Sequence, residues 1–351
     1  MMSNTLIVDL GNQTILFGVT GKFEPLIRIS HWGTNNRILF NSFTKDREVT
    51  NDYNPFKRGI VTDWNNLEML FERVFDILIE NQAIISLSTL TVLLSYPISF
   101  KKEDLYRLGQ IFFEKYNVEG LSLVEQPLAT LFYNNRVGGI VVDCGAEIIQ
   151  ISYYDNMHPK NESKCVINKG GVDITNQFNT RFKASLCDLT YSVKQKLFSV
   201  SPNAFDVTNV NSLPRHIALT ENGTEEIQYQ ISPDSEETIG IGRERFLLTE
   251  QFFQGFDSIT NHLGFLRNLT VEANLYITGG NSLIKGFQER LKSIVFGMNR
   301  RVHVVGMSNA ITSSFVGCNK YSQLKDFSHN VLHRDAYLNK DGMNKILKNM
   351  S

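Results

Sequence analysis

The sequence predicts an α/β protein built from two duplicated lobes, and three observations support this. An apolar strand followed by an Asp-x-Gly turn occurs twice, at 6–11 and 140–145, and a second β-rich strand follows each turn. Apolar strands and amphipathic helices alternate along the chain, which favours a parallel or mixed sheet flanked by helices. The 351 residues exceed the usual size of one domain, so two lobes are expected.

Side-chain periodicity and turn residues predict the individual elements in order. Asp63 is expected to cap an amphipathic helix whose apolar stripe is formed by Leu67, Leu70, Phe71, Val74, Phe75 and Leu78. A buried strand at 90–94, a helix near 101–115, a strand at 121–124 and a short helix at 126–133 follow. After the second hairpin, a strand at 274–278 leads into Gly279-Gly280 and a helix at 287–294. Polar residues 31–58 show little periodicity and are predicted to be irregular, and 201–240 to be a surface excursion.

Composition excludes several classes of function. A net charge of −1 and an isoelectric point near 6.7 argue against nucleic acid as a direct partner. The cysteines lack metal-type spacing and suit a reducing compartment: Cys144, Cys165, Cys187 and Cys318. Neither a secretory signal nor an uninterrupted membrane-spanning apolar run is evident. We therefore expect a soluble intracellular protein without a membrane partner.

The two hairpins carry chemistry that suits a phosphate ligand. A glycine in the turn allows backbone N–H groups to approach a phosphate, and an acid on each hairpin, Asp9 and Asp143, can order a hydrated divalent ion. The same residues also have a purely structural interpretation, because tight turns and helix caps favour glycine and aspartate. The sequence leaves both interpretations open.

Two such hairpins resemble the phosphate clamp of the actin, Hsp70 and sugar-kinase ATPase fold, in which two duplicated lobes surround a nucleotide cleft. Further segments resemble motifs of the actin family and follow the same order over nearly the whole chain. They lie at 58–64, 124–129, 170–175 and 276–280, and a weaker match lies at 315–317. This shared order disfavours Hsp70 and the sugar kinases.

The resemblance implies a domain organisation and a site. The first lobe would comprise 1–133 and 313–351, with a reduced subdomain 2 at about 31–56, and the second 134–312, with subdomain 4 at about 170–250. ATP or ADP with Mg²⁺ would be held by Asp9, Gly11, Asn12, Gln126, Asp143, Gly145, Gly171, Asp173, Lys194, Gly279, Gly280 and Asn281. Asp9 and Asp143 would hold the metal through water.

Several departures from the family pattern weaken this site. The loop Ser and Lys that meet the phosphates are Asn12 and Leu16, and the loss of that cation removes a contact of about 1.5–3 kcal/mol. The second loop gains a carboxylate at Glu147, and Gln150 replaces the histidine that helps to polarise the attacking water. Gln195 replaces an acid near the ribose, and Ile311 a lysine beside the adenine. Since phosphoryl transfer depends on positioning and charge, we expect weak or vestigial nucleotide binding and no efficient hydrolysis.

Two regions are shorter than in actin: 31–56, where actin carries its DNase-binding loop, and 253–279, where actin carries its hydrophobic plug. Filament growth needs a complementary surface at both ends of a subunit, so such a chain would cap and not polymerise. The first hypothesis is therefore a cytoplasmic, cytoskeletal actin-related protein at the pointed end of the dynactin filament, working in dynein-based microtubule transport and nuclear migration. The segments 3–5 and 29–33 resemble fungal members of that class.

Three alternatives remain open. The chain can be a nuclear actin-related subunit of a chromatin-remodelling complex, since such subunits also have degraded ATP sites. It can be an active ATPase like conventional actin, which the departures disfavour. It can also be an actin fold that binds another partner, because fold does not fix function. In each of the assembly roles the partners are other actin-related proteins and subunits of a multiprotein complex.

Overall fold

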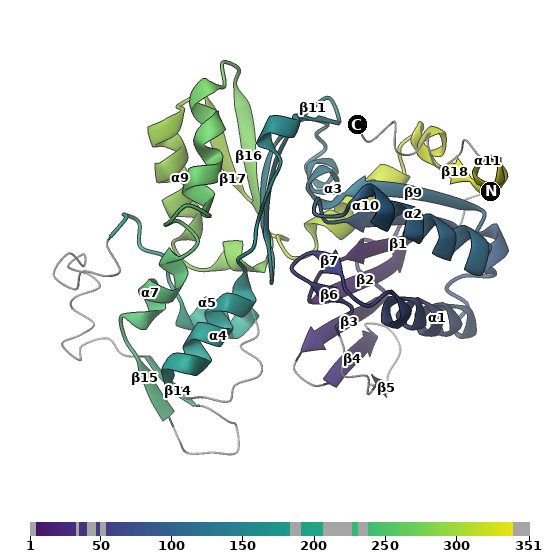
Figure 1. Cartoon of the computed structure of the whole chain (residues 1–351), viewed down its shortest axis with the longest axis horizontal. Helices are drawn as coiled ribbons and strands as arrows, with labels where there is room; N and C mark the ends of the chain where they lie inside the picture. Colours follow the sequence, from purple (N-terminus) through teal and green to yellow (C-terminus); the bar gives the residue numbers. More distant parts are fainter. Residues whose placement is uncertain are drawn as a thin grey trace. The chain divides into compact units, whose positions relative to one another are not determined.

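The structure is a computed structural model that describes residues 5–32, 35–40, 47–49, 54–182, 191–205, 227–230 and 238–339. These residues form two compact units (Figure 1). Unit 1 comprises Met1–Val141, Ser152–Val166 and Ile311–Ser351, and unit 2 comprises Val142–Ile151 and Ile167–Ala310. The expected division at 133/134 and 312/313 differs mainly at 152–166, where Tyr154 and Lys164 both bond to Glu125 of unit 1.

Unit 1 is organised around a sheet that has eight strands in its described part, in the order β18-β9-β8-β1-β2-β3-β4-β5. The parallel pairs are β1–β8 and β8–β9, and the other pairs are antiparallel. In chain order the strands are β1 (Thr5–Leu10), β2 (Thr14–Val19), β3 (Ile27–Trp32), β4 (Asn35–Phe40), β5 (Arg47–Val49), β8 (Thr91–Tyr96), β9 (Gly120–Glu125) and β18 (Leu332–His333). A separate small pair is formed by β6 (Phe56–Lys57) and β7 (Ile60–Val61).

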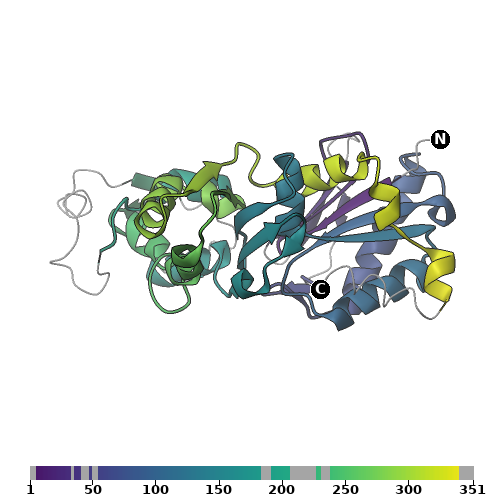
Figure 2. The same ribbon diagram turned by 90° about the horizontal axis from the view of Figure 1, so that it is seen from above.

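Helices cover both faces of this sheet (Figure 2). The unit-1 helices are α1 (Trp64–Glu80), α2 (Lys102–Gln110) with a π-helical turn (Ile111–Lys115), α3 (Gln126–Tyr133), α10 (Ser313–Ser322) and α11 (Arg334–Leu338). Alternate residues of β1 point to opposite faces, so Leu6 and Val8 pack in the cluster that contains the α1 stripe, whereas Ile7 packs with Phe315 of α10. Because β1 is packed on both faces, it holds the start of the first Asp-x-Gly turn, which follows it, in a defined position.

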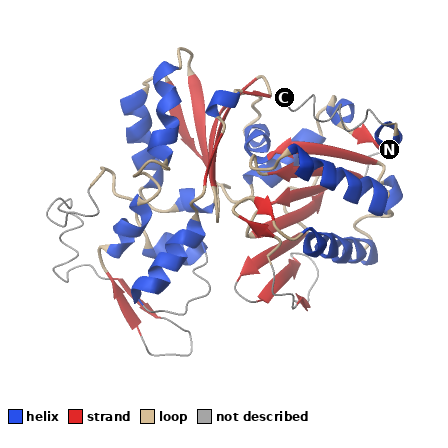
Figure 3. Ribbon diagram, viewed as in Figure 1, coloured by secondary structure: helices blue, strands red, loops and turns tan. Residues whose placement is uncertain are grey.

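A second sheet has the order β12-β11-β10-β16-β17, with β13 paired to β11, in its described residues (Figure 3), and its strands β16 and β17 belong to unit 2. Its strands are β10 (Gly139–Cys144), β11 (Ile149–Asp155), β12 (His158–Pro159), β13 (Cys165–Ile167), β16 (Ala273–Thr278) and β17 (Val302–Gly306), and β14 (Ile227–Gln230) pairs with β15 (Thr238–Ile241). The helices are α4 (Gly171–Phe182), α5 (Tyr191–Leu197), α7 (Glu244–Glu250), α8 (Ile259–His262) and α9 (Phe287–Met298).

Most of the sequence-predicted elements are confirmed. The α/β fold class is correct, and α1 begins after Asp63, whose side chain accepts a hydrogen bond from the Asn66 N–H at 3.0 Å. The helices expected near 101–115, 126–133 and 287–294 and the strands near 90–94, 121–124 and 274–278 are all present. No helix among the described residues combines the length and apolar character that crossing a membrane requires.

The prediction of an irregular stretch at 31–58 is wrong. The described parts of that stretch contain β4 and β5, which extend the sheet from β3 by antiparallel pairing. These strands form because the open edge of β3 offers backbone donors and acceptors, a cause that side-chain periodicity does not record. Parts of the expected subdomains fall outside the described residues, at 33–34, 41–46, 50–53, 183–190, 206–226 and 231–237.

Candidate functional site

The first hairpin turn is tight and depends on its glycine. The Gly11 N–H donates to the Asp9 carbonyl at 3.1 Å, and a Cβ at Gly11 would collide with the carbonyl oxygen of Thr14. This contact supports the structural interpretation of Gly11, because the turn needs a residue without a side chain whatever it binds.

Asp9 lies at the end of β1, at the centre of a buried polar cluster in unit 1. Its Oδ1 accepts hydrogen bonds from Ser95 Oγ at 2.6 Å, Gln126 Nε2 at 3.0 Å and Ser314 Oγ at 3.2 Å. Burial raises the pKa of Asp9, although these three hydrogen bonds act in the opposite direction. None of the described hydrogen bonds goes to Oδ2, so that oxygen suits a further donor such as a water molecule on Mg²⁺.

Asn12 and Leu16, which follow the turn, occupy different environments. The side chain of Asn12 is nine-tenths buried, and its Oδ1 has no hydrogen-bond partner. A buried acceptor without a donor fits a ligand or water that donates a hydrogen bond, and not a phosphate oxygen. Leu16 is buried in the apolar cluster with Ile7 and Phe315, so this position supplies no cation to a phosphate.

In unit 2, several predicted site residues lie close together at the second hairpin. Asn281 Nδ2 donates to the Gly145 carbonyl at 2.6 Å, and the Gly171 N–H donates to the same carbonyl at 3.3 Å. Lys194 Nζ donates to the Gly171 carbonyl at 2.7 Å, and Lys194 is buried. Burial lowers the pKa of Lys194 to about 8, while the negative charge of Asp173 acts in the opposite direction.

The remaining unit-2 residues support this cluster. Asp173 caps the start of α4, because its Oδ2 accepts the Gly170 N–H at 2.7 Å. Gly279 has a positive φ of 84°, and a Cβ there would lie 2.6 Å from Asp143 Oδ1, so only glycine fits. Gly280 opens the short 3₁₀ turn that carries Asn281. Gln150 Nε2 donates to Asp143 Oδ2 at 3.0 Å, at the position where the resemblance implies a histidine.

The structure therefore assembles the predicted residues into two groups, one in each unit. The unit-1 group is Asp9, Gly11, Asn12 and Gln126, and the unit-2 group is Asp143, Gly145, Gly171, Asp173, Lys194, Gly279, Gly280 and Asn281. The prediction that the two hairpins face one another across a cleft stays a prediction. No three His, Cys, Asp or Glu side chains gather as a metal site within the described ranges. The expectation that Asp9 and Asp143 hold the hydration shell of Mg²⁺ likewise stays a prediction.

Sequence reasoning missed two members of the Asp9 cluster. Ser95 lies beside Asp9 in the parallel register of β1 and β8, and Ser314 reaches it from the start of α10. A serine at the end of a buried apolar strand was the available signal for Ser95, but its partner is known only once the strand pairing is known. Ser314 had no local signal, since 305 residues separate it from Asp9.

The family is decided by comparison with known proteins. The profile described as "Actin" matches residues 2–209, more than half of the chain. This chain belongs to the actin family. It is 23% identical to "Centractin" of Schizosaccharomyces pombe over 95% of this chain and 94% of that protein. It is also 23% identical to "Actin-like protein 7A" of Rattus norvegicus over 96% of this chain and 81% of that protein. The chain is thus a divergent member of the actin family that aligns along nearly its whole length.

Proposed function

We propose that this actin-family chain is a non-polymerising structural protein that caps the pointed end of the short actin-related filament of dynactin, in support of dynein-based microtubule transport. The observation that carries the proposal is the similarity to a centractin over 95% of this chain and 94% of that protein. Centractin similarity favours dynactin among the multiprotein complexes in which actin-related proteins work, and it favours a cytoplasmic, cytoskeletal location.

The geometry of the subdomain 2 region supports an end position in a filament. The strands β3, β4 and β5 are joined through residues 33–34 and 41–46, and residues 50–55 lead from β5 to β6. These segments are short in sequence, which supports our proposal that the chain lacks an extended loop to a neighbouring subunit. An interface without such an arm has less area, and a stable interface commonly needs about 1,000 Å² or more.

The two site groups support a structural role and not an enzymatic one. Leu16 is in the core, Lys194 donates to a backbone carbonyl, and Gln150 occupies the position at which a histidine is implied. A glutamine amide has no titratable proton to exchange at neutral pH, so it cannot act as a general base. We infer that ATP or ADP with Mg²⁺ binds weakly or vestigially and that hydrolysis is absent.

Two experiments test the proposed function. Sedimentation of the purified chain under conditions that polymerise actin should leave it in the supernatant, with conventional actin as the positive control. Affinity purification of the native complex should recover dynactin subunits, and electron microscopy should place the chain at one filament end. Self-filaments, a position in mid-filament or recovery with remodeller subunits would refute the capping role. ATP turnover at the rate of filamentous actin would refute the inference about the site.

A further inference from the structure

Two buried polar side chains of unit 2, Lys194 of α5 and Asn281 of the 3₁₀ turn, meet over the backbone of Gly171. Lys194 Nζ donates to the Gly171 carbonyl at 2.7 Å, and Asn281 Nδ2 donates to the Gly145 carbonyl at 2.6 Å. Asn281 Nδ2 also lies 3.4 Å from the Cys144 carbonyl oxygen. Because buried donors need acceptors, the backbone of unit 2 holds both side chains in place.

These two side chains fill the space above Gly171. A Cβ at Gly171 would lie 2.8 Å from Asn281 Oδ1 and 3.1 Å from Lys194 Nζ. Non-bonded carbon atoms normally lie about 3.5–4.0 Å apart, so even a methyl group would be too close. A ligand that approaches the Gly171 backbone must therefore first displace one of the two side chains.

The contacts join segments that are far apart in the sequence. Gly145 belongs to the second hairpin, Gly171 opens α4, and Asn281 follows β16. The Gly171 N–H donates to the Gly145 carbonyl at 3.3 Å, and Gln195 Nε2 of α5 donates to the Leu283 carbonyl at 3.3 Å. These are the segments of unit 2 to which the resemblance to the actin family assigns the nucleotide.

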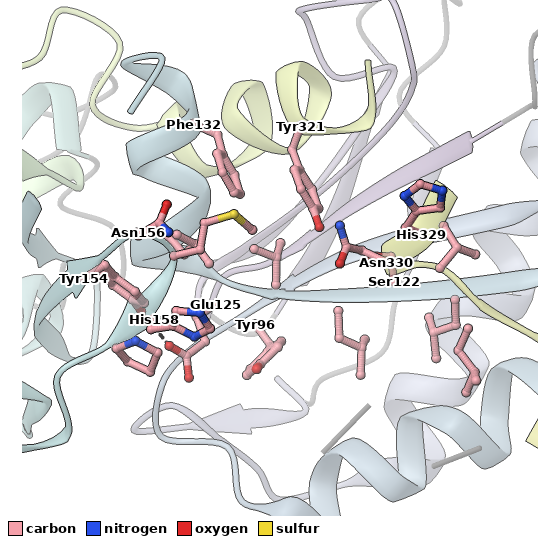
Figure 4. Close-up of a pocket in the computed structure, with 18 of the residues that line it drawn as sticks. Tyr96, Ser122, Glu125, Phe132, Tyr154, Asn156, His158, Tyr321, His329 and Asn330 are labelled. Atoms are coloured by element: carbon pink, nitrogen blue, oxygen red, sulfur yellow. Dashed lines mark hydrogen bonds between the residues drawn. The ribbon is translucent and has the colours of Figure 1, made fainter. Parts of the chain in front are cut away.

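Paired polar groups do not by themselves fill a site, as a hollow in unit 1 shows. This hollow of about 790 Å³ is formed by β9, α3, the β11–β12 turn, α10 and residues 329–336 (Figure 4). Glu125 in its wall accepts a hydrogen bond from Tyr154 Oη at 2.5 Å and a salt bridge from Lys164 Nζ at 2.7 Å, yet the space beside it stays open. At Gly171, by contrast, the paired side chains occupy the space itself.

We propose that Asn281, with Lys194 beside it, is an internal latch that closes the unit-2 part of the nucleotide site, so that a nucleotide binds only after displacing the Asn281 amide. The latch rests on the proposed function, since it explains why the binding proposed there is weak. Leu16 weakens binding because it supplies no cation, whereas Asn281 weakens it because a ligand must first break an existing contact. The net contribution of one hydrogen bond corresponds to a factor of about two to ten in affinity.

Titration of the full chain with a fluorescent ATP analogue and Mg²⁺ tests the latch. Asn281→Ala should bind the analogue about two- to tenfold more tightly than the wild type, because no amide contact has to be broken. The matched control is Asn299→Ala, which should bind as the wild type does. Asn299 also lies in unit 2, and its Nδ2 likewise donates to two backbone carbonyls, those of Leu266 at 2.7 Å and Leu269 at 2.8 Å.

The ratio between the variants decides the outcome. Equal affinity of the wild type and Asn281→Ala, or the same gain in Asn299→Ala, would overturn the latch. If Asn281→Ala does not fold, Asn281→Ser takes its place, since its side chain is one bond shorter and still polar. Tight binding by the wild type would refute the proposed weak binding but leaves this ratio to be measured, so the two failures can be told apart.

Hydrogen exchange without added nucleotide gives a second, independent readout. Asn281→Ala should lose protection at residues 144–149 and at the start of α4, because the Asn281 amide no longer holds the second hairpin. Asn299→Ala should keep that protection and lose it instead at the 3₁₀ helix η5 (Leu263–Asn268). Unchanged exchange at the second hairpin in Asn281→Ala would contradict the latch.

Discussion

A buried pair of side chains, Glu250 and Arg290, should make the stability of unit 2 depend on pH. Glu250 at the end of α7 is fully buried, and Arg290 of α9 donates to its Oε1 at 2.8 Å. Gln254 Nε2 donates to the same oxygen at 3.0 Å, whereas Glu250 Oε2 and Arg290 Nε have no hydrogen-bond partner. Burial raises the pKa of Glu250 from 4.5 to about 7, and the charge of Arg290 acts in the opposite direction without cancelling it.

The direction of the pH effect follows from this raised pKa. The folded state holds the proton of Glu250 up to about pH 7, while the unfolded state releases it near pH 4.5. The resulting stabilisation is fully present below pH 4.5 and is lost as the pH rises through about 7. At ~1.4 kcal/mol per pH unit between the two pKa values, the loss is about 3 kcal/mol. The variant Glu250→Gln has no carboxyl group to ionise, so its unit 2 should not show this loss.

The assay must report on unit 2. Both tryptophans, Trp32 and Trp64, lie in unit 1, so tryptophan fluorescence does not report on unit 2. Hydrogen exchange of α7 and α9 peptides between pH 5 and 8, corrected for the intrinsic pH dependence of exchange, gives the opening free energy. The control is Glu289→Gln, which changes an exposed acid on α9 and should leave the pH profile as in the wild type. Equal pH slopes for wild type and Glu250→Gln would refute the reasoning.

Two further predictions concern unit 1, where urea unfolding followed by tryptophan fluorescence is a suitable measurement. Leu16→Lys should lower the free energy of unfolding by about 4 kcal/mol, because it buries a charge in an apolar cluster. Leu16→Met should lower it by less than about 1.5 kcal/mol. Equal losses for the two variants would contradict the placement of this side chain. Asp63→Ala should lower the free energy of unfolding by about 1 kcal/mol, because it removes the cap of α1. The control is Asp76→Ala, which changes an exposed residue in the middle of the same helix. Equal losses for the two variants would show that the cap contributes nothing.

Local signals in the sequence predicted a large part of the fold. The Asp63 cap and the apolar stripe after it predicted α1, since both act within a few turns of the same helix. The two Asp-x-Gly turns predicted both hairpins for the same reason, and their repetition pointed to duplicated lobes. The candidate site residues within each unit could also be named, because turn glycines and strand-end acids are recognisable in sequence.

What only the tertiary structure decided depends on residues far apart in the chain. The acceptor role of Asp9 toward Ser314, the burial of Glu250 against Arg290 and the pocket beside α11 had no local signal. The strands β4 and β5 were missed because they pair with an edge that an earlier strand provides. Periodicity records which face of an element is apolar, but not which distant group will meet a buried polar atom. That choice is made by packing, where each buried donor or acceptor must find a partner once water is excluded.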